Sequence, residues 1–306
     1  EGAPDRFRKA GPFRFAACMF GHFFVSTRMP LWITVLLLGI IEGITEFIPI
    51  SSTGHLIIAE KVFELTQVLP RSHWLVQAGP LKDLFNVVIQ SGAVLAVLPL
   101  FPHRLRQFVF EWRTPATRDY LLKILAAFAL TGVGGVLLEK NDFTLPEHLL
   151  PVAVALAVGG VLFLVVEHRL KGRRLLDEIT WPIVLAVGAG QLLAAVFPGT
   201  SRSGATILLA LLFGLNRVAA TEFTFLVGIP TMLAAGGLKI LKTVQQASAA
   251  PPEFWPMVGL GFVAAAAVSF IAVKWLLRYV QTHTFVLFGW YRLGLSAVLL
   301  LFLVAG

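Results

Sequence analysis

Apolar segments limit what this chain can fold into more than any other feature. Six of them stand alone, at 84–101, 121–138, 149–167, 223–238, 255–277 and 285–305. A transmembrane helix needs about 20 mostly apolar residues. Only 14% of the residues are charged, against about a quarter in soluble domains. These segments therefore predict an all-α polytopic membrane protein with about six full transmembrane helices.

Four shorter apolar segments form two pairs, each broken by a polar loop. The first pair is 31–50 and 55–66, and the second is 181–197 and 204–215. Irregular backbone at membrane depth is tolerated only where protein or a wet cavity satisfies its polar groups. We therefore expect each pair to be a re-entrant hairpin that enters and leaves the membrane on one side.

The two broken pairs resemble each other, which suggests an internal repeat. Both loops run from Pro through a Ser/Thr cluster to Gly, and each half has one broken pair followed by three full spans. Because three is odd, the second half must lie upside down relative to the first. We expect residues 29–306 to form a single integral-membrane catalytic domain, with inverted repeat halves at about 29–170 and 175–306, and a site at their interface.

The charge distribution gives an orientation. The chain carries a net charge of +8, and its Lys and Arg gather in segments 103–123 and 168–174, whereas 243–254 has none. Cytoplasmic loops of membrane proteins are rich in Lys and Arg. We therefore expect these two basic segments to be cytoplasmic and no nucleic acid partner. The basic residues of the 59–83 loop argue weakly against this threading.

Residues 1–28 stand apart from the pattern. Their apolar stretch at 15–25 is too short to span a bilayer, although a signal peptide is one alternative. We expect an N-terminal extension, native or not, before a functional chain that starts at Met29.

Glu42 and Glu46 lie four residues apart in an apolar helix, so they share a face. A carboxylate inside a membrane is costly and usually functional. The two acids could bind a divalent cation, Mg²⁺ or Ca²⁺, with waters and a substrate phosphate completing the shell. Alternatively, one of them could act as a general base, or both could be structural.

The first loop places Ser51, Ser52, Thr53 and His55 directly after these acids. Hydroxyls and main-chain N–H groups at a helix start suit phosphate oxygens. A serine near a histidine suits nucleophilic catalysis, and Ser52 and His55 can lie on one helix face. Helix capping is the alternative reading for the hydroxyls.

The second loop holds Arg202 between Ser201 and Ser203. A guanidinium near the midplane needs an anion, and its planar fork matches a phosphate. An ion pair with Glu42 or Glu46 is the alternative, and both can hold when no substrate is bound. Arg292, far from either end of the last span, should likewise have an acid or a phosphate as its partner.

These motifs resemble a known family. Glu42-Gly-Ile-Thr-Glu46-Phe-Ile-Pro-Ile-Ser-Ser-Thr-Gly-His55 is similar to the Glu-x-x-x-Glu signature of the undecaprenyl-pyrophosphate phosphatases, the bacitracin-resistance proteins. Pro198-Gly-Thr-Ser-Arg-Ser-Gly-Ala-Thr206 is similar to their second signature. The resemblance runs from about Met29 to the end of the chain.

The resemblance implies a multi-pass enzyme of the bacterial inner membrane, dependent on a divalent cation, often a homodimer, with its site open to the periplasm. It implies hydrolysis of a polyprenyl pyrophosphate lipid, undecaprenyl pyrophosphate, to the monophosphate and inorganic phosphate. This reaction recycles the lipid carrier for cell-wall synthesis and confers bacitracin resistance. By position, the family's acids match Glu42 and Glu46, its nucleophile Ser52, its histidine His55 and its phosphate-binding arginine Arg202.

A transporter or flippase for polyprenyl phosphate is the alternative function, because an inverted repeat suits transport as well. The Ser/His/Glu set favours catalysis, since transport needs matched charge but no nucleophile. From the residues alone, attack by Ser52 and attack by water both remain open.

Overall fold

The structure is a computed structural model, and it describes residues 29–65, 69–70, 73–77, 79–141, 148–244 and 250–305. The extension expected at 1–28 lies outside the described residues. The secondary structure of the described residues consists of helices, and their only β contact is an isolated bridge between Leu176 and Leu215. The predicted all-α class is confirmed.

Among the described residues, six helices are long and apolar enough to cross a membrane. They are α4 (Pro80–Leu95, extended by a 3₁₀ turn at Leu98–Leu100), α6 (Pro115–Lys140), α7 (Leu149–Leu170), α10 (Arg217–Val244), α11 (Phe254–Thr282) and α12 (Val286–Ala305). Each contains one of the six predicted spans almost entirely. The protein is therefore a polytopic membrane protein.

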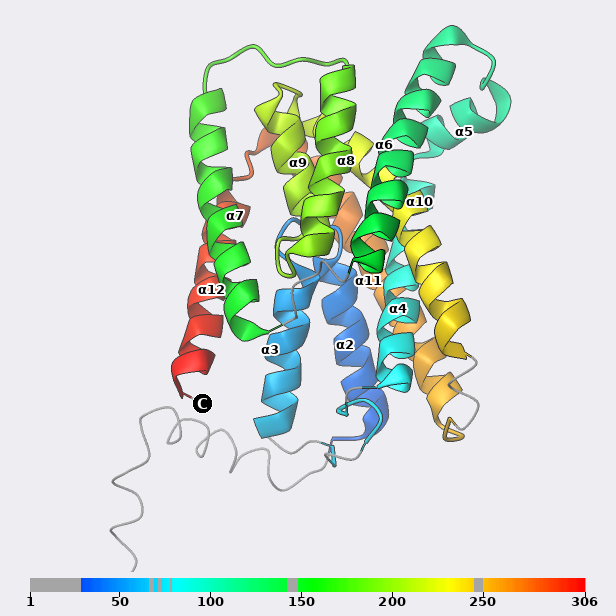
Figure 1. Ribbon diagram of the computed structural model, residues 1–306, viewed down its shortest axis with the longest axis vertical. Coiled ribbons are helices and arrows are strands. Elements are labelled where there is room, and N and C mark those ends of the chain that lie inside the picture. The colour runs from blue at the N-terminus through cyan, green and yellow to red at the C-terminus, as the bar shows by residue number, and fades with distance from the viewer. Residues whose placement is uncertain are drawn as a thin grey trace, which may run out of the picture.

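The broken apolar pairs form two helical hairpins. The first consists of α2 (Leu31–Thr45) and α3 (Ser52–Leu65), and the second of α8 (Trp181–Val196) and α9 (Arg202–Leu212). Figure 1 shows the hairpins entering from opposite ends of the molecule, with their connecting loops meeting in the middle. All these helices are shorter than the roughly 20 residues that a full crossing needs.

Helix packing follows the expected inverted repeat. In the first half α2 packs on α11, and in the second half α8 packs on α6, so each hairpin leans on a long helix of the other half. The remaining long helices pair across the halves as α7 with α12 and α4 with α10. Small residues permit the close approaches: a Cβ on Gly160 would lie 2.8 Å from the carbonyl oxygen of Gly289.

The two basic segments lie at the same end of the molecule, as the predicted threading requires (Figure 1). One part of this end was not anticipated. Helix α5 (Pro102–Phe110) begins with Pro and carries Arg104 and Arg106 on a short segment of mixed polarity, which apolar patterning alone did not separate from a loop. Arg104 forms an ion pair with Glu222 of α10 at 2.6 Å, which attaches α5 to the helix bundle.

Candidate active site

Each hairpin loop ends in a serine that directly precedes the next helix and has an unusual backbone conformation. Ser51 has φ +76° and Ser201 has φ +65°, and they are the two non-glycine residues with positive φ in the described chain. Ser51 Oγ accepts a hydrogen bond from the N–H of Gly54 at 3.3 Å, and Ser201 Oγ accepts one from the N–H of Gly204 at 3.2 Å. Both serines are therefore N-caps. Left-handed backbone at a non-glycine residue is costly and concentrates at functional sites.

The caps place two different functional residues at equivalent positions. Ser52 is the first residue of α3, and Arg202 is the first residue of α9. The loops touch, because Ser203 Oγ donates to the carbonyl oxygen of Ile48 at 3.4 Å. Two helix N-termini, each with a partial positive charge, thus begin beside a guanidinium, an arrangement that favours an anion with several charges.

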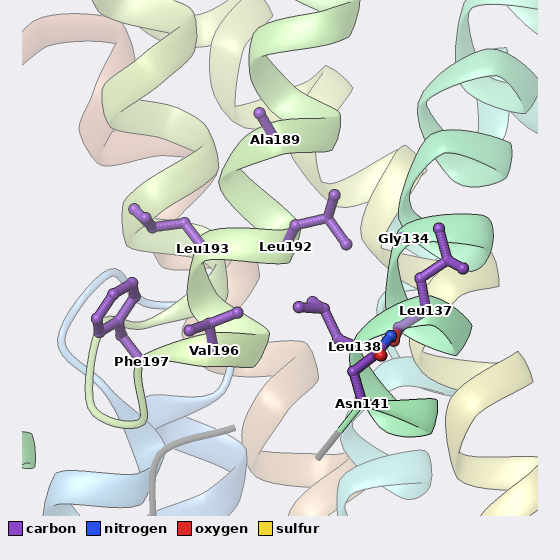
Figure 2. A pocket seen from close by; sticks show the side chains of 9 residues that line it. All are labelled: Gly134, Leu137, Leu138, Asn141, Ala189, Leu192, Leu193, Val196 and Phe197. Carbon is purple, nitrogen blue, oxygen red and sulfur yellow. The ribbon is translucent and has the colours of Figure 1, made fainter. Parts of the chain in front are cut away.

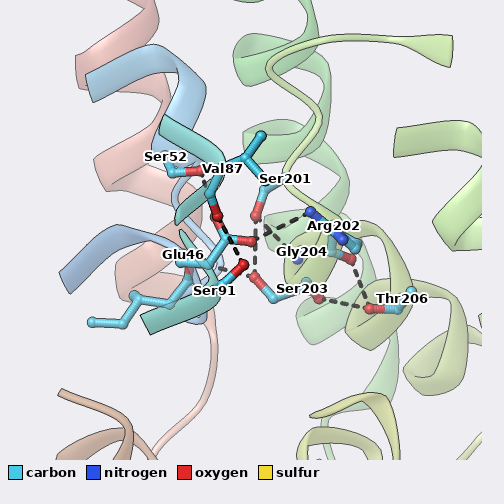
Figure 3. A network of polar contacts seen from close by, with 10 residues as sticks. Glu46, Ser52, Val87, Ser91, Ser201, Arg202, Ser203, Gly204 and Thr206 are labelled. Carbon is cyan, nitrogen blue, oxygen red and sulfur yellow. Dashed lines mark hydrogen bonds and ion pairs between the residues drawn. The ribbon is translucent and has the colours of Figure 1, made fainter. Parts of the chain in front are cut away.

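A carboxylate connects the two helix starts. Ser52 Oγ donates to Glu46 Oε2 at 2.8 Å, and Arg202 lies 3.4 Å from Glu46 Oε1 (Figure 3). Glu46 is 7% exposed, so the carboxylate is buried, whereas the side chain of Arg202 is 29% exposed. The ion pair expected for Arg202 without substrate is present. Because one oxygen of Glu46 already receives the Ser52 hydroxyl, this carboxylate is placed to accept its proton.

His55 does not pair with Ser52, which corrects the sequence-based expectation. Its Nδ1 lies 2.7 Å from the carbonyl oxygen of Ser51, which can only accept, so Nδ1 carries a proton. Its Nε2 lies 2.7 Å from the hydroxyl of Tyr291, and the two rings stack at 5.6 Å. The main-chain contact one turn back directs the ring toward α12, although Ser52 and His55 are only three residues apart.

Glu42 fits a cation site in part. It is 2% exposed, and its Oε2 has no hydrogen-bond partner. Its carboxyl interacts with Glu46, one turn further along. No group of three or more His, Cys, Asp or Glu side chains suited to a metal occurs among the described residues. The protein therefore offers two carboxylates, which suits a hard cation that keeps waters and takes substrate oxygens.

Arg292 holds both loops through their main chain. The acid or phosphate partner expected from the sequence is wrong, since its guanidinium donates to the carbonyl oxygens of Thr200 at 2.8 Å and Pro49 at 3.4 Å, and to two more on α7. The side chain is 1% exposed. Irregular loops leave carbonyl groups without helical partners, and a five-donor fork satisfies several at once.

The remaining predicted hydroxyls lie around the same centre. Thr53 is half-buried on the first turn of α3, and Ser203 is buried on that of α9. A cavity of about 20 Å³ is lined in part by both members of the ion pair, Glu46 and Arg202, and by Ser203. The predicted hydroxyls, Glu46 and Arg202 thus lie together around the two loops, whereas the His55 ring turns away toward Tyr291.

Two structural residues escaped the sequence analysis. Gln191, which matches Glu42 in the repeat, donates to Thr131 of α6 at 3.3 Å. Glu167, at the end of the predicted span 149–167, binds Arg217 of α10 through both oxygens and accepts the N–H of Phe285 at 2.8 Å. Apolar patterning could not predict that Glu167 is buried, with an exposed fraction of 4%.

These observations define the class of protein: a polytopic membrane protein in which the loops of two opposed helical hairpins bring a serine, a carboxylate and an arginine together. Residues 35–298 match the family described as bacitracin resistance protein BacA. The chain belongs to this family.

Curated relatives agree with that assignment over nearly the whole chain. An undecaprenyl-diphosphatase of Rhizobium etli (strain CIAT 652) is 48% identical over 270 residues, which cover 88% of this chain and 96% of the relative. An undecaprenyl-diphosphatase of Xanthomonas euvesicatoria pv. vesicatoria is 47% identical over 274 residues, covering 89% and 97%.

Proposed function

We propose that this protein hydrolyses undecaprenyl pyrophosphate to undecaprenyl phosphate and inorganic phosphate. By regenerating the monophosphate, it recycles the lipid carrier of cell-wall synthesis and confers bacitracin resistance. The support is the family membership, together with relatives at 47–48% identity named for this activity.

The observation that carries the proposal is the contact of Ser52 and Arg202 with one carboxylate. Ser52 Oγ and the Arg202 guanidinium lie 2.8 Å and 3.4 Å from the two oxygens of Glu46. A nucleophile (Ser52) and an anion-binding guanidinium (Arg202) thus both contact one base (Glu46). A transporter of an anionic lipid needs the guanidinium, but its function does not require a serine that is hydrogen-bonded to a buried carboxylate.

The reaction begins with Ser52. Glu46 Oε2 takes the hydroxyl proton as Ser52 Oγ attacks the terminal phosphorus, and the bond from that phosphorus to the bridging oxygen breaks. Undecaprenyl phosphate leaves. Water then attacks the phosphorus of the phosphoserine, Glu46 returns the proton to Ser52 Oγ as the bond from Oγ to phosphorus breaks, and phosphate leaves with the protons of the water. Arg202 and the N–H groups at the starts of α3 and α9 stabilise the charge on the equatorial oxygens.

A direct attack by water is the competing chemistry at the same site. Glu46 would then activate the water, and Ser52 would only donate a hydrogen bond to the phosphate. The hydrogen bond from Ser52 to Glu46 supports the first mechanism, because it already directs the hydroxyl proton to its acceptor.

We include a divalent cation, Mg²⁺ or Ca²⁺, held by Glu42 and Glu46. The partnerless Oε2 of Glu42 supports this assignment, because a buried carboxylate oxygen without a donor needs a cation or a proton. When bound, such a cation neutralises part of the pyrophosphate charge. Full activity after exhaustive chelation with EDTA would exclude the cation and leave Glu42 protonated.

The proposed setting is the bacterial inner membrane, with both hairpins re-entrant and the basic end cytoplasmic. The α2–α3 hairpin then opens to the periplasm, where the pyrophosphate of the lipid enters. A homodimer follows from the family resemblance, and light scattering of the purified protein measures it.

Phosphate release tests the proposal. The purified protein in detergent should release one inorganic phosphate and one undecaprenyl phosphate per substrate consumed. Glu46→Gln should lose this activity, whereas Glu60→Gln, on α3 of the same hairpin, should retain it, because Glu60 pairs with Lys82 of α4 away from the loops. Movement of lipid across vesicles by the wild type without phosphate release would instead favour a flippase.

A further inference from the structure

An apolar groove lies between the lower ends of α6 and α8. It measures about 770 Å³ and is lined by side chains near the end of α6, from Gly134 to Asn141, and near the end of α8, from Ala189 to Phe197. Figure 2 shows the side chains from the end of α8 facing those from the end of α6 across this space. The single polar side chain, Asn141, donates to the carbonyl oxygen of Leu137 at 2.7 Å, so the lining presents few free polar groups.

The inverted repeat shows that this groove is a local departure from symmetry. Its counterpart in the other half, between α2 and α11, is closed by backbone contact: a Cβ on Gly43 would lie 2.6 Å from the carbonyl oxygen of Ala265. Between α6 and α8 the glycines meet side chains instead, since a Cβ on Gly134 would lie 2.6 Å from Leu192 Cδ1. Leucine side chains therefore hold α6 and α8 apart where the equivalent pair touches.

Helix lengths add to the difference. Helix α11 continues well past its contact with α2 and ends at Thr282, whereas α6 ends at Lys140, soon after its contact with α8. At the level of the hairpin loops, α2 and α11 are thus in close contact, whereas an apolar groove lies open between α6 and α8.

The groove leads to the catalytic loop. Phe197, at its lower end, directly precedes the Pro198–Ser201 loop, and its carbonyl oxygen accepts the N–H of Thr200 at 3.2 Å. On the opposite face of α8, Gln191 lines the small cavity that contains Glu46 and Arg202. The end of α8 therefore separates the anion site from the apolar groove by the thickness of one helix.

We infer that this groove holds the polyprenyl chain of the substrate, an inference that rests on the proposed hydrolysis. The anion site lies where the hairpin loops meet, in the middle of the molecule (Figure 1). A lipid whose pyrophosphate reaches that depth cannot keep its tail along the usual membrane normal. The tail must leave sideways at the level of the loops, past Phe197 and between α6 and α8.

Such a groove orients the tail more than it attracts it. Lipid chains are as apolar as leucine side chains, so moving a tail from bilayer to groove gains little hydrophobic free energy. The benefit is alignment of the pyrophosphate, and misplacement by about 1 Å can reduce a rate on the order of 100-fold. Long-chain substrates should therefore depend on the groove, and short-chain substrates should not.

Filling the groove with Ala189→Trp tests the inference, with Val133→Trp as the matched control. Ala189 is exposed and lines the groove, whereas Val133 is 64% exposed on α6 but lies outside the lining. For Ala189→Trp, kcat/KM should fall at least about tenfold with undecaprenyl pyrophosphate and stay within about twofold with farnesyl pyrophosphate. Val133→Trp should match the wild type with both substrates.

Each other outcome has a definite meaning. Equal losses with both substrates, an equal defect in Val133→Trp, or no defect at all would overturn the inference. A change from dimer to monomer in Ala189→Trp, measured by light scattering, would make the groove a protomer interface and overturn it as well. Failure of the wild type on both substrates would instead overturn the proposed hydrolysis.

Discussion

At the scale of single residues, the proposed reaction depends on Ser52, Glu46 and Arg202. Sequence analysis predicted all three, because acids and an arginine in apolar segments are rare and costly. It paired Ser52 with His55, however, and the structure pairs it with Glu46. Helical spacing tells which residues can share a face but not where their side chains find partners, and the partner of His55 is Tyr291, from the far end of the chain.

Arg202→Lys should lower kcat/KM substantially. A point charge cannot reproduce the planar fork that binds a phosphate through two oxygens, so we expect a loss of at least about tenfold, rising to about 10²–10³-fold in Arg202→Ala. Phosphate release measures both variants. Arg278→Lys, on the exposed face of α11, is the control, and wild-type activity in Arg202→Lys would argue against a two-oxygen contact.

Ser52→Ala distinguishes the two mechanisms. If Ser52 attacks phosphorus, the variant should lose most of its activity together with any phosphoenzyme trapped by acid quench. If Ser52 only donates a hydrogen bond, the loss should be about 1–2 kcal/mol, on the order of tenfold. Ser91→Ala is the control, because that hydroxyl bonds within its own helix, to Val87. A tenfold loss without a trapped intermediate would leave water as the nucleophile.

At the scale of elements, the hairpins depend on Arg292. The sequence predicted the helices, since apolar segments and Pro-containing breaks mark their ends directly. It could not predict that the two loops share one arginine from α12, because main-chain acceptors leave no trace in the residue pattern. Its contacts with the carbonyl oxygens of Pro49 and Thr200 link two loops that are far apart in the chain, and two contacts with α7 anchor the side chain.

Arg292→Leu should destabilise the loops and reduce activity. It leaves buried carbonyl groups without donors, each costing about 1–3 kcal/mol, so we expect at least about 2 kcal/mol of lost stability and a lower melting temperature in detergent. Arg292→Lys should show a smaller loss, because an ammonium reaches fewer of the carbonyls. Unchanged melting of both variants would contradict this role.

At the scale of the whole molecule, the inverted repeat places the ends of the helices. The threading predicted from Lys and Arg asymmetry agrees with the arrangement in Figure 1, where α5 and the start of α10 share one end. Sequence symmetry did not reveal the groove between α6 and α8. The groove lies open between α6 and α8 whereas α2 and α11 are in close contact, because the α6 glycine Gly134 faces a leucine side chain and the α2 glycine Gly43 faces the backbone of its partner helix.

Cysteine labelling in cells tests the orientation. In a Cys18→Ser background, Glu253→Cys should react with a membrane-impermeant reagent in intact cells, and Arg106→Cys should react only after the cells are opened. Both positions are exposed; Arg106 is on α5 and Glu253 directly precedes α11, and Figure 1 shows α5 and the start of α11 at opposite ends of the bundle. Labelling of both positions from the same side would contradict the odd number of spans in each half.

The central claim is that two loops from opposite ends of the molecule form one catalytic site. A double-mutant cycle on Ser52→Ala and Arg202→Ala, measured as kcat/KM for undecaprenyl pyrophosphate, tests it most directly. Residues that act as one unit give strongly non-additive losses. We expect the double variant to be about as impaired as the worse single variant. A double variant whose loss is the product of the two single losses would show that the loops act independently and would contradict the account.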